Sequence, residues 1–100
     1  MPRVTKAQMT IMTDDDLLQG ATDAAKQHQE LEAKQDKCDC PFERDIVFQQ
    51  RRTLRNVYRR YEEVLLRRYV DATTTRDPEY LNYYRDLIEN KIPPLYKIAL

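Results

Sequence analysis

The segment 41–72 is predicted to form a single helix, and its length sets the shape of the whole chain. Its 32 residues would span about 48 Å at 1.5 Å per residue. A compact domain of 100 residues has a radius of gyration of only about 13 Å. The helix must therefore project from any globule that this chain can form. We predict an extended all-α protein with a long central helix.

A weakly amphipathic helix is predicted before it, over residues 14–37, after an irregular arm at 1–13. Thr13 is a good N-cap, and the three aspartates that follow favour the positive end of the helix dipole. The apolar face of this helix is a narrow stripe of mostly small residues: Leu17, Ala21, Ala24, His28 and Leu31. Such a stripe buries little area, so we expect this helix to become ordered by docking onto another molecule.

A third helix is predicted from Pro78 to about Lys91, with Asp77 as its N-cap. We expect it to fold back antiparallel on the C-terminal half of the central helix, so that 41–92 form a helical hairpin. The tail 93–100 is apolar enough to pack against the hairpin.

Composition excludes several classes of function. Seventeen basic and seventeen acidic residues leave no net charge, which argues against a simple polycation that binds nucleic acid. With no Ser and one Gly, the chain has neither a serine nucleophile nor a glycine-rich phosphate loop, and we predict no enzyme. No apolar run is long enough for a signal peptide or a membrane span, so we predict an intracellular, reducing location without membrane insertion.

Neither a metal nor another cofactor is predicted. Cys38 and Cys40 are separated by one residue, whereas paired zinc ligands are usually two to four residues apart. The remaining candidate ligand, His28, is on the apolar stripe, which is typical of a packed histidine. Glu63 has Arg59 and Arg67 four residues away on either side, so ion pairing along a helix explains this carboxylate without catalysis.

Arginine and tyrosine are concentrated in the second half of the chain. Ten Arg and no Lys occur between Cys38 and Asn90, and all seven Tyr are at or after Tyr58. From Ile46 to Tyr61 there are five Arg and no acidic residue. Protein interfaces are enriched in both residue types. The residues predicted to bind a partner are Arg44, Arg51, Arg52, Arg55, Arg59, Tyr58 and Tyr61, together with Leu17, Ala21, Ala24 and Leu31 of the preceding helix.

Short motifs in this region resemble a known family. Val57-Tyr58-Arg59, followed by Leu65-Leu66-Arg67 and later by Tyr83-Tyr84-Arg85, is similar to the Leu-Tyr-Arg motif of small helical mitochondrial accessory and assembly proteins. The chain departs from that family in having Val57 where the motif has Leu. It also places about 55 residues before a motif that is normally near the N-terminus. The resemblance implies a mitochondrial accessory subunit.

Together these features favour a non-enzymatic structural subunit that bridges components of a large assembly through contacts with acidic protein surfaces. An obligate hetero-assembly is expected in preference to a homo-oligomer, and a cytoskeletal lattice such as a microtubule or axoneme is slightly favoured over a mitochondrial complex. The main alternative is an RNA-binding subunit that uses Arg51, Arg52, Arg55, Arg59 and Arg60, with Tyr58 and Tyr61 stacking on bases. A self-associating coiled coil ranks lower, because Gln50 and Arg68 interrupt its seam.

Overall fold

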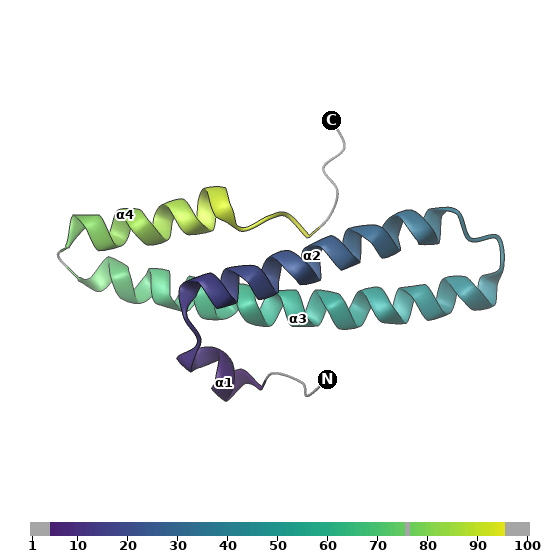
Figure 1. Ribbon diagram of the computed structural model, residues 1–100, viewed down its shortest axis with the longest axis horizontal. Coiled ribbons are helices and arrows are strands. Elements are labelled where there is room, and N and C mark those ends of the chain that lie inside the picture. The colour runs from purple at the N-terminus through teal and green to yellow at the C-terminus, as the bar shows by residue number, and fades with distance from the viewer. Residues whose placement is uncertain (1–4, 76, 96–100) are drawn as a thin grey trace.

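The computed structural model describes residues 5–75 and 77–95, and in them it is an elongated bundle of helices without strands (Figure 1). The helices are α1 (Lys6–Ile11), α2 (Asp14–Asp36), α3 (Pro41–Thr74) and α4 (Pro78–Asp86), which continues as the π-helical turn η1 (Leu87–Lys91). The radius of gyration is 15.9 Å and the principal extents are 55 × 36 × 17 Å. The predicted extended all-α fold with a long central helix is confirmed.

The signals that begin α2, α3 and α4 act as predicted. Thr13 caps α2 by accepting a hydrogen bond from the Asp16 amide at 3.2 Å, and Asp77 caps α4 by accepting from the Glu79 amide at 3.0 Å. Pro41 stands in the first turn of α3, where its missing N–H costs nothing. α3 ends two residues later than expected, at Thr74, because the hydroxyls of its last threonines donate to carbonyls three residues back.

The N-terminal arm differs from its prediction. Residues 6–11 form α1 rather than an irregular segment. Thr5 and Gln8 form a reciprocal capping box, in which each side chain accepts a hydrogen bond from the other residue's amide at 3.2 and 2.8 Å. Met9 is buried at 2% exposure, and α1 packs against α3. The cap and the burial of Met9 help to hold a helix too short to be stable alone.

α2 finds its packing partner within the chain. It lies antiparallel along α3, and its small residues Leu17, Ala21 and Ala24 are buried in the core between the two helices. Gly20 of the same helix lies directly against the ring of Tyr61. The expectation that this stripe docks onto another molecule is therefore corrected, because α3 already covers it.

The C-terminal half of the chain forms the predicted hairpin. α4 packs on α3, and Figure 1 shows it folding back along the end of α3 that lies far from the α2–α3 connection. Leu87 and Leu95 join the core at 2% and 3% exposure. Of the tail 93–100, which we expected to pack, Leu95 is buried, Pro94 is exposed, and 96–100 lie outside the described residues. At the opposite end the α2–α3 hairpin extends beyond α1 and α4 (Figure 1).

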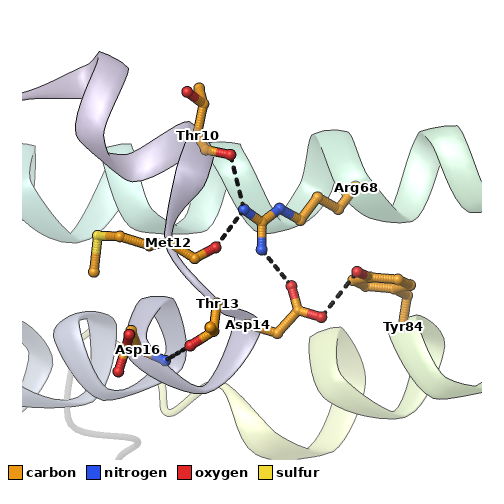
Figure 2. A network of polar contacts seen from close by, with 7 residues as sticks. All are labelled: Thr10, Met12, Thr13, Asp14, Asp16, Arg68 and Tyr84. Atoms are coloured by element: carbon orange, nitrogen blue, oxygen red, sulfur yellow. Dashed lines mark hydrogen bonds and ion pairs between the residues drawn. The ribbon is translucent and has the colours of Figure 1, made fainter.

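A polar cluster joins all four helical segments at the end of the molecule where α4 packs (Figure 2). Arg68 of α3 donates to Asp14 Oδ1 at 2.5 Å and to the carbonyl oxygens of Thr10 and Met12 at 3.1 and 2.6 Å. Tyr84 of α4 donates its hydroxyl proton to the other oxygen of Asp14 at 2.8 Å. Burial raises the pKa of Tyr84 well above its usual range, so the phenol remains a donor. Two carbonyls at the end of α1 and the first residue of α2 thus share one guanidinium.

Candidate functional site

The predicted arginines gather on one side of α3, over residues 44–59. Arg51, Arg52 and Arg55 surround a small hollow of about 60 Å³ together with Phe48 and His28. Arg44 precedes Phe48 by about one helical turn and Arg59 follows Arg55 by about one turn, and both are exposed. We call Arg44, Phe48, Arg51, Arg52, Arg55 and Arg59 the arginine face.

Two of these arginines have partners in the chain, Arg51 on α2 and Arg59 on its own helix. Arg51 bonds to Gln35 of α2 and has Glu32 Oε2 at 4.0 Å. Its Nε and that same carboxylate oxygen are buried without a hydrogen bond. Arg59 pairs with Glu62 at 2.9 Å and lies 5.7 Å from the centre of the Tyr58 ring. Arg51 therefore ties α3 to α2, and the charge of Arg59 is paired with that of Glu62.

The other three arginines of the arginine face have no ion-pair partner among the described residues. In the described part of the chain, no carboxylate oxygen lies within 4 Å of Arg44, Arg52 or Arg55. Phe48 lies among them with 49% of its surface exposed. Sequence reasoning missed Phe48, although its position relative to Arg52 and Arg55, four and seven residues on, places it on the same side of the helix. The result is an apolar ring bordered by cations.

The tyrosines assigned to this surface are elsewhere. Tyr58 is 3% exposed and donates its hydroxyl proton to the Pro93 carbonyl at 2.8 Å, while Tyr61 is 8% exposed and packs on Gly20. Burial, followed by the charge of Glu62, raises the pKa of the Tyr58 phenol. Both rings belong to the core, so the prediction that they face a partner is corrected. The same applies to Leu17, Ala21 and Ala24.

His28 is buried at 2% exposure behind the arginine face. Its Nδ1 lies 3.2 Å from the Leu95 carbonyl oxygen, which can only accept, so this nitrogen carries the proton. Next to it, Gln29 donates from Nε2 to the Pro94 carbonyl at 2.8 Å. The packed histidine expected from the sequence thus holds the segment 93–95 on α2.

Stability is expected to fall as the pH drops below about 6.5 because of His28. Desolvation and then the charge of Arg51 lower its pKa, against which the Leu95 carbonyl raises it. The unfolded chain therefore binds more protons than the folded chain between the ordinary histidine pKa and the lowered one, and the free energy of unfolding declines with pH in that window. Urea denaturation between pH 7.5 and 5.5 measures this slope. His28 is the only histidine, so His28→Gln should remove the slope, and a slope that persists in this variant would contradict the assignment.

A second hollow lies on the other side of the α2–α3 contact. It is a groove of about 590 Å³ lined by Glu30, Leu31 and Lys34 of α2 and by Gln50, Thr53 and Leu54 of α3, among others. Ile46 and Phe42 continue its α3 wall toward the hairpin connection, with 46% and 73% exposure. Of the predicted docking stripe, Leu31 alone keeps a partly open position, and it faces this groove.

The described residues contain no group of three or more His, Cys, Asp or Glu side chains placed to hold a metal ion. Cys38 and Cys40 are both free thiols in the α2–α3 connection. In the same part of the chain, none of the helices combines the length and apolar character that a bilayer crossing requires.

Comparisons with known proteins identify no relative of the chain. The Leu-Tyr-Arg resemblance therefore stays one of short motifs, in which Tyr58 and Tyr84 are buried. No family model matches the chain, and no match was found among curated proteins or among solved structures.

Proposed function

We propose that the chain is a non-enzymatic structural subunit that binds an acidic protein surface through its arginine face. The observation that carries the proposal is the group of Arg44, Arg52 and Arg55, which have no carboxylate within reach in the described part of the chain and which border the exposed ring of Phe48. Cations around an apolar centre suit a partner that presents carboxylates around an apolar side chain.

The architecture supports a bridging role. The arginine face lies on the part of the α2–α3 hairpin that extends beyond the other helices, so it can reach into an assembly while α1 and α4 remain at the far end (Figure 1). Arg51, fixed by Gln35 and Glu32, gives the face a rigid base. Three kinds of assembly are candidates: an acidic lattice such as a microtubule or axoneme, a mitochondrial complex, and a ribonucleoprotein. The acidic lattice is favoured.

RNA binding is the weaker alternative. Sequence-tolerant binding of single strands combines a cationic groove with aromatic rings on which bases stack. Tyr58 and Tyr61 are buried, so this surface offers Phe48 as its aromatic group. Phosphate contacts by Arg44, Arg52 and Arg55 would be few, so such binding would be weak.

Reversing the two best-placed charges tests the proposal. In Arg52→Glu/Arg55→Glu, we expect cosedimentation with polymerised microtubules to weaken by about tenfold or more, because attraction becomes repulsion at two adjacent positions. Arg51 is left intact, since it stabilises the α2–α3 contact. The matched control, Lys26→Glu/Arg67→Glu, makes the same change in net charge at exposed positions away from the arginine face and should bind nearly as well as the native chain.

Binding to a fluorescent poly(U) strand, measured by anisotropy in parallel, separates the alternatives. Tight RNA binding that Arg52→Glu/Arg55→Glu abolishes, without microtubule binding by the native chain, would favour the ribonucleoprotein hypothesis. If neither probe binds, or if the control variant loses as much affinity as the test variant, the arginine face is not the functional surface for these partners.

A further inference from the structure

We propose that the groove on the opposite side of the α2–α3 hairpin binds a second copy of this chain, giving an antiparallel dimer. This inference goes beyond the function proposed above and uses none of the residues of the arginine face. Ile46 and Phe48 are two positions apart, hence about 200° apart around α3, with the buried Val47 between them. The two surfaces therefore point in different directions, and each can be tested without the other.

The groove contains an apolar strip that nothing covers in the described part of the chain. Phe42, Ile46, Gln50, Thr53 and Val57 follow one another at helical spacing along this side of α3, and the first two are 73% and 46% exposed. Leu31 of α2 and Leu54 of α3 line its floor. Burying such a stripe against an identical stripe would complete a four-helix bundle from two hairpins.

The register of α2 on α3 identifies where a two-fold axis can pass. Asp14 bonds to Arg68, Gly20 touches Tyr61, and Glu32 lies beside Arg51. Residue 32 of α2 is therefore nearly level with residue 50 of α3. We place the two-fold axis at this level, perpendicular to the helices and parallel to the grooved face. Rotation about it lays α2 antiparallel on the α2 of the second copy and α3 antiparallel on the α3 of the second copy.

Charge complementarity then selects this arrangement. Glu30 and Lys34 both line the groove, and each is two residues from position 32. Glu30 of one copy therefore faces Lys34 of the other. The two contacts are reciprocal, as an isologous interface requires. A second copy is also free of net repulsion, because the chain has no net charge.

The apolar residues of α3 also pair across the same two-fold axis. Ile46 and Leu54 are each four residues from position 50, so Ile46 of one copy packs over Leu54 of the other. Gln50 lies on the axis, where its amide can donate to the carbonyl of the second Gln50. A polar pair on the axis fixes register and orientation, as a buried polar pair does in a coiled coil. Gln50, which interrupts a conventional coiled-coil seam, thus becomes the residue that sets the alignment.

The area is sufficient for a stable dimer. With residue 50 at the centre, the hairpin connection near residue 38 of one copy reaches the level of residue 62 of the other. The overlap is about 36 Å long and about two helix diameters, or 20 Å, wide. It buries about 700 Å² on each copy, about 1,400 Å² in total, within the range of specific interfaces. It also ends before the level of Arg68, where α1 attaches.

Sedimentation equilibrium of the full chain tests the dimer. We expect a reversible equilibrium between the 12.0 kDa monomer and a species of twice that mass. Ile46→Glu should raise the dissociation constant by about tenfold or more, because two carboxylates are buried in the seam. Phe48→Glu is the matched control, with 49% exposure on the arginine face, and should leave the dimer intact. Circular dichroism verifies that both variants keep their helices.

Cross-linking tests the position of the axis. In a chain with Cys38→Ala and Cys40→Ala, Gln50→Cys should form a disulfide between copies on mild oxidation, because residues on the axis approach within disulfide range. Arg52→Cys, on the arginine face, should not. A native chain that stays monomeric, a dimer unaffected by Ile46→Glu, or cross-linking through position 52 instead of position 50 would each overturn the proposal.

Discussion

Arg68→Ala is expected to lower the free energy of unfolding by about 3 kcal/mol, measured by urea denaturation. The guanidinium donates three hydrogen bonds, one to Asp14 and two to the carbonyl oxygens of Thr10 and Met12. The side chains of Arg68 and Asp14 are only 22% and 17% exposed. Removing Arg68 leaves a largely buried carboxylate with Tyr84 as its remaining donor in this cluster, and two carbonyls without a donor (Figure 2).

The neighbouring position supplies the control. Arg67 is exposed on the same helix, so Arg67→Ala should change stability by about 0.5 kcal/mol or less. Arg68→Lys should recover only part of the loss, since an ammonium group cannot reach three acceptors with the geometry of a guanidinium. Equal stability of Arg67→Ala and Arg68→Ala would show that the cluster does not hold α1 and α4 on the bundle.

The same residues explain how much of the fold could be predicted from sequence. Thr13, Pro41 and Asp77 are local signals, and the helices begin where they predicted. Thr13 and Asp77 accept from amides two or three residues away, and Pro41 suits the first helical position. The capping box of Thr5 and Gln8 is equally local and could have revealed α1. What a local signal does not contain is the identity of the surface that covers a helix. The small residues of α2 correctly predicted that another helix packs closely against them. That helix is α3 of this chain and not part of another molecule.

The arginine face illustrates the same limit for the site. Spacing along α3 correctly brought Arg51, Arg52 and Arg55 to one side of the helix. Spacing along one helix identifies only partners three or four residues away. It therefore does not predict that Gln35 and Glu32 lie beside Arg51, or that Asp14 lies beside Arg68. The tyrosines were misplaced for a related reason. A phenol hydroxyl can enter the core where a distant carbonyl accepts its proton, as Pro93 does for Tyr58.

Gly20→Ala is expected to destabilise the protein by about 2 kcal/mol, although alanine is the better helix former by about 1 kcal/mol. No glycine among the described residues has a positive φ, so the backbone of α2 would accept alanine at position 20 without strain. The obstacle is the ring of Tyr61. A Cβ added at Gly20 would lie 2.5 Å from Cζ and 2.7 and 2.8 Å from the two Cε atoms, far inside the usual carbon–carbon contact of about 3.5 Å.

Moving the Tyr61 ring would cost packing energy, because Tyr61 is 8% exposed and belongs to the same buried cluster as Leu65 and Ala24. Either α2 moves away from α3 or the ring displaces its neighbours. A double-mutant cycle with Tyr61→Leu, followed by urea denaturation, isolates this contact. Tyr61→Leu alone should destabilise the native chain, but in the Gly20→Ala background the shorter side chain should restore part of the lost stability. A Gly20→Ala variant more stable than the native chain would mean that α2 and α3 do not approach this closely at position 20.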